Sequence, residues 1–384
     1  MSHLKYLVIA IGVTLVSTSP ASAQTPVQVS QSDVYTLRWA LPADPGIHEL
    51  SKDQRSRPTL SPDAQFVFRA YSNGRIEKRR VSDGEVLWTR DLNIEVQSAL
   101  AYLSSFEGQD WISVVDALGT LHALSAADGT TLKEVKVGGA SSCEPVVTAH
   151  GLLLVAGDDR LVMLDPTLAK TEPKWSTERV SSRGMTMLGA GCPALAGSLV
   201  CHGRSDGSVS CYDLKTGTLS WSRRLASTQS RLAVHDADAG PVYHQGAIYA
   251  ASISGGVYRL SASTGEIEWQ LDLKNIHRLG ANRFGLFALS MDGMLIGLDE
   301  KGEKRFETTL PSKRLETLLV GKTLVLISAG ETGLVLIEGE RGKPIQARAL
   351  AGEALSLPST AGRHLVVQDA SGFLYHFELS GMGS

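Results

Sequence analysis

The sequence predicts an all-β fold, an eight-bladed β-propeller of four-stranded antiparallel blades whose ring is closed by an N-terminal strand. Three observations lead to this prediction. A tight-turn motif recurs eight times along the 384 residues, short segments around each turn alternate between apolar and polar residues, and no long segment has the 3.6-residue period of a helix. A repeat of about 40 to 50 residues is typical of propellers and related arrays.

The repeated motif begins with an opening turn and a short strand. The opening turns lie 37 to 49 residues apart, at Gly74, Gly119, Arg160, Gly207, Gly256, Gly293, Gly333 and Gly372. The next strand reads GSVSCYDL in the fourth copy and GVYRLS in the fifth, and a second turn such as KTGT or STGE follows it. Glycine supplies the positive φ that such tight hairpins require. Two further strands precede each opening turn, as in PVYHQGAIYAAS, so each copy provides the four strands of one blade.

An aromatic residue follows the second turn in most copies. It lies four residues after the turn glycine, or after a longer turn in the third copy, as Trp88, Trp175, Trp221, Trp269 and Phe306. We expect each ring to pack as a large apolar wedge between neighbouring blades. Lys133 and Gln346 occupy this position in copies two and seven, which are therefore expected to lack the wedge.

The eighth copy ends at Leu379 without a fourth strand. The segment YTLRWALPA, residues 35 to 43, carries Trp39 and is predicted to complete the last blade, which would remove a free sheet edge. The predicted organisation is a linker over residues 24–34, a single propeller over 35–380 and a tail over 381–384.

The first 23 residues predict a cleaved export signal. His3 and Lys5 precede an apolar run that is too short to cross a bilayer, and Ala21-Ser22-Ala23 forms a small-x-small cleavage site. No later segment is predicted to span a membrane. No cysteine stands at the predicted cut, so a lipid anchor on this signal is not expected. The formal net charge of -3 gives no basic excess, which argues against nucleic acid as the main partner.

The four cysteines of an exported chain can be oxidised. Cys192 and Cys201 are symmetric about the Ala196-Gly197 turn, and Cys201 and Cys211 are equally symmetric about Asp206, so either bridge is possible. Buried free thiols are the alternative. Cys143 has no obvious partner in the sequence.

Two short motifs are suggestive of catalysis or metal binding but lack the necessary context. GRSDG, residues 203–207, fits G-x-S-x-G, yet it lies in a hairpin turn and not in the strand-to-helix turn of a nucleophile elbow. DADAG, residues 236–240, starts like a calcium loop but has Ala247 where the twelfth position needs glutamate. We therefore expect no catalytic residues, no metal and no cofactor.

The repeat resembles that of the pyrroloquinoline-quinone (PQQ) type propellers, which include both dehydrogenases and non-enzymatic proteins. The long connections VSSRGMTMLGAGCPALAG (180–197) and LAVHDADAGP (232–241) resemble more specifically the BamB family of outer-membrane assembly proteins. In that family an Arg-Gly pair and two aspartates spaced by one residue dock on the periplasmic domains of the insertase BamA. The matching positions here are Arg183, Gly184, Asp236 and Asp238, with Val180 and Ser182 standing where the family has leucines.

This resemblance implies a non-catalytic periplasmic scaffold of the outer-membrane β-barrel assembly (BAM) complex, held at the outer membrane through a BamA-like insertase. Unfolded outer-membrane proteins, paired to a strand edge, are a further partner hypothesis. Two alternatives stay open: a small PQQ-dependent dehydrogenase-like enzyme, and an exported propeller that binds another envelope component. It also stays open whether Arg183 pairs with Asp236 or Asp238 inside the protein and only ties the two connections together.

Overall fold

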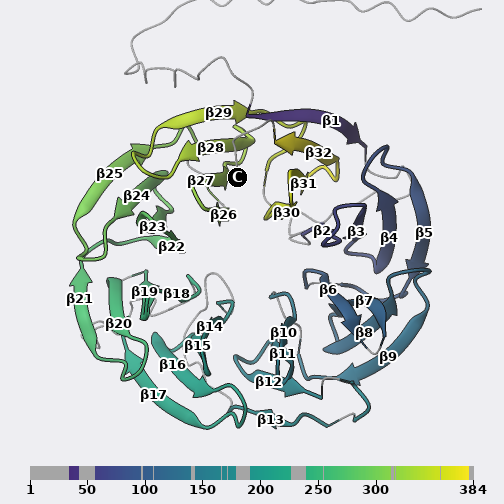
Figure 1. Ribbon diagram of the computed structural model, residues 1–384, viewed down its shortest axis with the longest axis horizontal. Coiled ribbons are helices and arrows are strands. Elements are labelled where there is room, and N and C mark those ends of the chain that lie inside the picture. Colours follow the sequence, from purple (N-terminus) through teal and green to yellow (C-terminus); the bar gives the residue numbers. More distant parts are fainter. Residues whose placement is uncertain are drawn as a thin grey trace, which may run out of the picture.

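The structure is a computed structural model in which every regular element of the described residues is a β-strand (Figure 1). It describes residues 34–42, 57–96, 98–106, 108–139, 143–165, 167–170, 172–178, 191–225, 239–253, 255–312, 315, 317–354 and 356–379. Eight four-stranded antiparallel sheets form a ring, which confirms the predicted eight-bladed propeller. The boundaries given above for the linker and the tail stay predictions, because nearly all of both segments lies outside the described ranges.

The first four blades follow one another along the chain, each with its first strand near the centre of the ring and its fourth at the rim (Figure 1). Blade 1 contains β2 (Thr59–Leu60), β3 (Phe66–Ala70), β4 (Arg75–Arg80) and β5 (Val86–Asp91). Blade 2 contains β6 (Ala101–Phe106), β7 (Gln109–Val115), β8 (Thr120–Ser125) and β9 (Thr131–Lys136). Blade 3 contains β10 (Val146–Thr148), β11 (Gly151–Val155), β12 (Leu161–Leu164) and β13 (Trp175–Ser176). Blade 4 contains β14 (Ala194–Ala196), β15 (Leu199–Gly203), β16 (Ser208–Asp213) and β17 (Leu219–Arg224).

The second half of the ring repeats this arrangement. Blade 5 contains β18 (Val242–His244), β19 (Ala247–Ser252), β20 (Gly256–Ser261) and β21 (Ile267–Leu271). Blade 6 contains β22 (Ile276–Asn282), β23 (Gly285–Ser290), β24 (Met294–Leu298) and β25 (Lys304–Thr309). Blade 7 contains β26 (Thr317–Val320), β27 (Leu324–Ser328), β28 (Leu334–Glu338) and β29 (Pro344–Arg348). Blade 8 contains β30 (Ser359–Ala361), β31 (His364–Gln368), β32 (Leu374–Leu379) and β1 (Tyr35–Leu41).

The N-terminal strand closes the ring. β1 pairs antiparallel with β32, from Tyr35 opposite Leu379 to Leu41 opposite Leu374, with a bulge between Leu37 and Trp39. The last blade therefore joins the two ends of the described chain, and the rim edge of β32 is covered as predicted.

The middle strands are buried on both faces because each blade packs against a neighbour on either side. Every residue of β8 and of β11 is buried, whereas β5 at the rim is almost entirely exposed. The apolar cores therefore lie between blades, and a single blade could not cover its own faces. The propeller is held together by these interblade layers.

The aromatic wedges pack onto the second turn of the following blade. A Cβ atom on Gly129 would lie 2.8 Å from the ring of Trp88, and one on Gly217 would lie 2.6 Å from the ring of Trp175. The indole Nε1 of Trp221 donates a hydrogen bond of 2.9 Å to the carbonyl of Ala262, just before the next such turn. Glycine is therefore required in the second turn of a blade partly because a larger side chain there would collide with the aromatic ring of the preceding blade.

Blades 2 and 7 have no aromatic wedge, and each is followed by a blade that has no glycine between its third and fourth strands. Lys133 precedes blade 3, whose β12 and β13 are joined by a longer connection without glycine, with Leu168 at φ 51°. Gln346 precedes blade 8, whose outer strand β1 comes from the other end of the chain. The buried Gln346 Oε1 accepts hydrogen bonds from the amides of Val34 (2.8 Å) and Tyr35 (3.0 Å), and its Nε2 donates to the Tyr35 carbonyl (3.0 Å). Gln346 therefore binds the start of the ring-closing strand where a tryptophan would otherwise pack.

Candidate functional site

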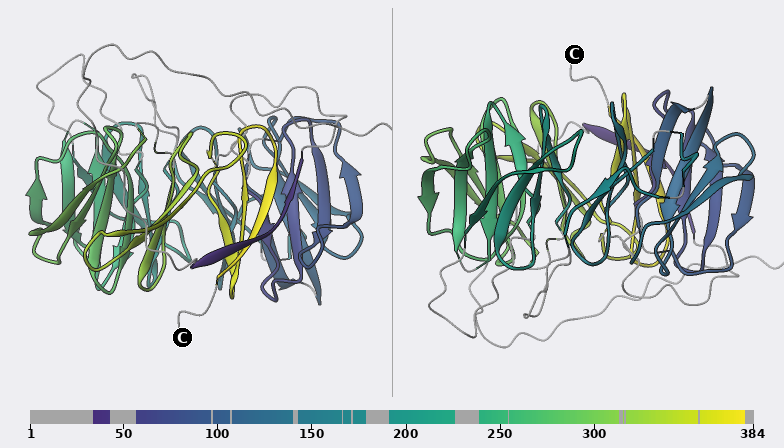
Figure 2. Two further views of the ribbon diagram at one scale, coloured as in Figure 1. Left: turned by 90° about the horizontal axis from the view of Figure 1, so that it is seen from above. Right: turned by 90° about the horizontal axis from the view of Figure 1, so that it is seen from below.

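The propeller is a disc whose strands run between two flat faces (Figure 2). We call one of them the connection face: it carries the opening turns, such as those at Gly119 and Gly207, and the ends of the segments that join consecutive blades. The opposite hairpin face carries the turns between the first and second strands and between the third and fourth strands of each blade.

The six predicted site residues lie outside the described residues. Val180, Ser182, Arg183 and Gly184 fall between residues 178 and 191, and Asp236 and Asp238 fall between 225 and 239. The strands that flank these two segments are described. The first segment joins β13 to β14, and the second joins β17 to β18. Both segments therefore leave and rejoin the disc on the connection face, at three consecutive blades.

A disulfide fixes the base of the first segment. Cys192, just before β14, is bonded to Cys143, just before β10 of the preceding blade, with the two Cα atoms 5.5 Å apart. The next blade is also close, since a Cβ on Gly240 would lie 3.4 Å from the Cys192 carbonyl oxygen. The connections into blades 3, 4 and 5 are therefore packed against one another beside the two predicted segments.

The cysteine pairing corrects part of the sequence prediction. Cys201 and Cys211, which are paired neighbours on β15 and β16, form the second disulfide and confirm one of the two alternatives. The other alternative, Cys192 with Cys201, is wrong, because the hairpin turns at Gly197-Ser198 and places Ala194 opposite Cys201. The free-thiol alternative is also wrong, as the described chain has no free cysteine. No partner of Cys143 could be predicted from the sequence, because that partner, Cys192, lies 49 residues away in another blade.

Hydrogen bonds between the opening turns of blades 3 and 4 hold this part of the connection face. Asp159, at φ 64°, accepts from the amide of Ser205 (2.9 Å) and from its hydroxyl through Oδ2. Arg204 donates to the Tyr212 hydroxyl (3.2 Å) and to the carbonyl of Glu178 (3.2 Å), the last described residue before the first segment. Arg204 therefore anchors the chain where that segment begins.

A buried histidine lies beneath these turns. His202 is 1% exposed, and its Nε2 is 4.0 Å from Oδ1 of Asp159. Burial lowers the pKa of His202 to about 4, against an opposing contribution from Asp159 and with a further lowering by Arg204. The imidazole is thus neutral at physiological pH and adds no charge to the site.

The residues that build this site were largely missed from the sequence. Arg204 and Ser205 belong to GRSDG, whose only recognisable pattern in the sequence is the G-x-S-x-G of a nucleophile elbow. The structure places this motif in a hairpin turn, with the Ser205 hydroxyl bonded to a carboxylate and not to a histidine. Charged residues also occur in other opening turns, as at Asp292 and Glu331, so no local signal in the sequence singles out Asp159 and Arg204. Within the described ranges, no three His, Cys, Asp or Glu side chains are grouped as metal ligands would be, and no helix suited to crossing a membrane is found.

Comparisons with known proteins give a consistent family. The family model described as outer membrane protein assembly factor BamB matches residues 72–309. Relatives of that name include the proteins of Moranella endobia (24% identical over 254 residues), Yersinia pestis (23% over 249) and Escherichia coli strain K12 (21% over 286). The matches cover 64%, 62% and 67% of this chain, and 64%, 62% and 68% of the relatives. The aligned part therefore spans slightly less than two thirds of the first two relatives.

Two solved structures have the same fold. The crystal structure of BamB from Moraxella catarrhalis matches with a TM-score of 0.76 at 17% identity, covering 90% of this chain and 100% of that chain. The computationally designed protein Ika8 matches with a TM-score of 0.68 at 14% identity, covering 84% and 95%. At these identities the structures show the propeller fold alone. The family match over residues 72–309 covers more than half of the chain, and the protein therefore belongs to the BamB family of outer membrane protein assembly factors.

Proposed function

We propose that the protein is a non-catalytic periplasmic scaffold of the outer-membrane β-barrel assembly complex, and that its connection face docks on the periplasmic domains of a BamA-like insertase. Arg183 with Gly184 and Asp236 with Asp238 would supply the polar contacts, and Val180 and Ser182 would lie beside them. In this proposal the chain reaches the periplasm by its N-terminal export signal and associates with the outer membrane through its partner.

The observation that best supports this proposal is the place on the disc from which the two segments leave. They are long connections, matched in length among those between the described strands only by the one that joins β1 to β2, they leave the same face at consecutive blades, and the first of them is fixed at its base by the Cys143–Cys192 disulfide and by Arg204. Binding residues concentrate on such loops over a rigid scaffold. A surface that presents both an arginine and carboxylates suits a partner of complementary charge.

Charge reversal tests the docking surface. We expect Arg183→Glu combined with Asp236→Arg and Asp238→Arg to reduce co-purification with the insertase by at least about tenfold, since like charges would then face each other across the interface. Thermal unfolding should be unchanged. The matched control is Lys215→Glu with Glu266→Arg, two exposed residues on the hairpin face of blades 4 and 5. Undiminished co-purification of the first variant would reject these residues as the docking site.

The intramolecular alternative gives a different result in a charge swap. If Arg183 pairs with Asp236 only within the chain, exchanging the two residues should restore both stability and co-purification. If both residues contact the insertase, the swapped variant should stay impaired in co-purification.

The non-catalytic part of the proposal is tested by an absorbance scan with added PQQ and calcium, in which a saturable spectral change would contradict it.

A further inference from the structure

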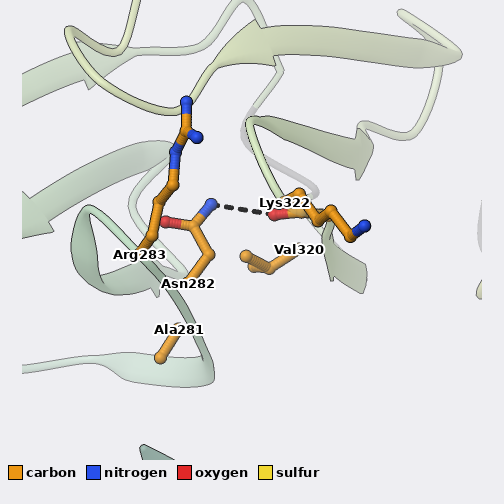
Figure 3. A pocket seen from close by; sticks show the side chains of 6 residues that line it. Ala281, Asn282, Arg283, Val320 and Lys322 are labelled. Atoms are coloured by element: carbon orange, nitrogen blue, oxygen red, sulfur yellow. Dashed lines mark hydrogen bonds between the residues drawn. The ribbon is translucent and has the colours of Figure 1, made fainter. Parts of the chain in front are cut away.

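A preformed depression lies on the hairpin face between blades 6 and 7 (Figure 3). Its volume is about 370 Å³, and it is lined by Ala281, Asn282, Arg283, Val320, Gly321 and Lys322. The first three residues end β22 and start the turn to β23, and the other three end β26 and start the turn to β27. The depression is therefore built from the innermost hairpins of two neighbouring blades, on the face opposite to the predicted docking segments.

The walls of this depression are fixed by the protein itself. The buried Asn282 donates from Nδ2 to the Gly321 carbonyl (2.8 Å) and accepts from the Phe284 amide through Oδ1 (2.9 Å). Gly280 allows β22 and β26 to approach, since a Cβ there would collide with Val320. The two hairpins are thus tied together before any ligand arrives, which lowers the entropic cost of binding.

The rim of the depression is cationic. Arg283 and Lys322 are exposed, and neither forms an ion pair with an acidic side chain of the described residues. The Arg283 guanidinium lies 4.7 Å from the centre of the Phe284 ring, which fixes its stem. Arg363 holds a position in the corresponding turn of blade 8, so three consecutive blades carry a cation in their first turn.

The inner wall is apolar. Ala281 and Val320 are half-buried side chains of the innermost strands, next to the turns that carry Arg283 and Lys322. The same place in the strands of blades 3, 4 and 5 is held by Val147, Leu195 and Tyr243, which are 49%, 38% and 41% exposed. Apolar side chains therefore continue around the centre of the ring from the cationic rim.

We propose that this site binds an acidic peptide segment that carries an apolar side chain beside its carboxylates. The apolar side chain would occupy the depression between Ala281 and Val320, and the carboxylates would pair with Arg283 and Lys322, with Arg363 next along the rim. A flat anionic surface fits less well, because the second turns on the same face expose acidic residues such as Asp128, Glu300 and Glu340. The site is independent of the proposed insertase contact and lies on the other side of the disc.

Fluorescence anisotropy with a labelled peptide of alternating glutamate and phenylalanine tests this site. We expect saturable binding that weakens with added salt, and weaker binding of two companion peptides, one with lysine for glutamate and one with serine for phenylalanine. The variant Arg283→Glu with Lys322→Glu should bind the first peptide at least about tenfold more weakly. Arg283→Lys with Lys322→Arg should retain binding, because the charges are kept.

The matched control is Lys301→Glu with Lys343→Glu, two exposed lysines in the second turns of the same blades and on the same face. This control should bind like the unchanged protein, and all variants should unfold at the same temperature. The proposal is overturned if the unchanged protein shows no saturable binding or if the reversal at Arg283 and Lys322 has no effect. It is also overturned if vesicles of phosphatidylglycerol bind more tightly than the peptide through the same two residues, since the partner would then be a lipid surface.

Discussion

A single polar side chain stabilises the junction of blades 7 and 8, where the ring departs from its repeat. Gln346, on the outer strand of blade 7, replaces the aromatic wedge beside blade 8, the one blade whose outer strand arrives from the other end of the chain. Its amide makes three hydrogen bonds to the backbone of Val34 and Tyr35, which a tryptophan could not make. Gln346 therefore binds the closing strand through hydrogen bonds to the backbone of that strand as well as through packing.

Gln346→Ala should destabilise the protein by about 2–3 kcal/mol, because the amides of Val34 and Tyr35 would be left buried without this acceptor. Lys133→Ala is the matched control, since Lys133 occupies the same place in blade 2 and is only half-buried. That change should stay within about 0.5 kcal/mol. Chemical denaturation measures both. Equal effects of the two substitutions would mean that Gln346 has no special role in closing the ring.

His202 makes the stability depend on pH in a defined direction. Its pKa is about 4 in the folded protein, against 6.5 for an ordinary histidine, because burial disfavours the charged form. The unfolded chain therefore binds more protons between these two values, so the stability falls as the pH is lowered from about 6.5 towards 4. His376, whose pKa burial and His364 also lower to about 4, acts in the same direction.

Lowering the pH from 7 to 4.5 should therefore destabilise the unchanged protein more than the variant His202→Gln, by on the order of 2 kcal/mol. Glutamine is neutral throughout this range, and His376 remains as a common background in both proteins. The measurement is the free energy of unfolding at several pH values. Parallel curves for the two proteins would show that His202 does not titrate as its burial implies.

The outer strand of one blade packs against the second turn of the next blade. The aromatic ring at the end of one blade and the glycine in the second turn of the next form one packing unit, as for Trp221 with Gly265 and Phe306 with Gly342. This explains why the ring of one blade and the turn glycine of the next blade are missing together, between blades 2 and 3 and between blades 7 and 8. The repeated phrase in the sequence therefore encodes contacts between blades and not only hairpins within them.

Gly265→Ala should destabilise the protein by about 3 kcal/mol, since a Cβ there would lie 2.5 Å from the Trp221 ring and the residue has a φ of 69°. Gly246→Ala is the matched control, with a similar φ of 79° but open space around the added methyl group. Its cost should be about 1 kcal/mol, from backbone strain alone. Denaturant midpoints give the difference. If both changes cost the same, the ring contact contributes nothing beyond the turn.

The elements were predictable from local sequence, whereas the site was not. Alternation, turn glycines and a proline directly before five innermost strands, as at Pro145, Pro193 and Pro241, all act over a few residues and can be read along the chain. The Cys143–Cys192 bridge and the hydrogen bond from Ser205 to Asp159 join residues 49 and 46 positions apart. No periodicity records such contacts, because only the closure of the ring brings the opening turns together. A two-residue error in one hairpin register was enough to misplace the partner of Cys192.

The whole ring depends on its closing blade, whose two sides are built differently. On the side of blade 7, the fully buried Tyr35 packs edge-to-face against Phe377 of its own blade, and its hydroxyl donates to the Leu334 carbonyl of blade 7 (3.3 Å). Towards blade 1, the contact includes a buried charge: Arg69 donates to the carbonyl of Gly372, and its guanidinium lies 3.8 Å from Glu77. Arg69 and Glu77 both belong to blade 1, so the Gly372 carbonyl is the group that blade 8 contributes, and a buried guanidinium donor that lost this acceptor would be left unsatisfied. The closing blade is therefore fixed in position on both sides.

Removing the closing strand should weaken the entire propeller and not one blade. A variant that lacks residues up to Pro42 should lose about 3 kcal/mol or more, since the buried Tyr35 and the pairing of β1 with β32 are lost together. A synthetic peptide of residues 34–42 added in excess should raise its unfolding midpoint again, because it binds only the folded ring. The same peptide with Tyr35→Ala is the control and should restore much less. A truncated chain that unfolds at the same midpoint as the full chain would mean that the ring is stable without its closing strand, and that the pairing with β32 only covers an exposed edge.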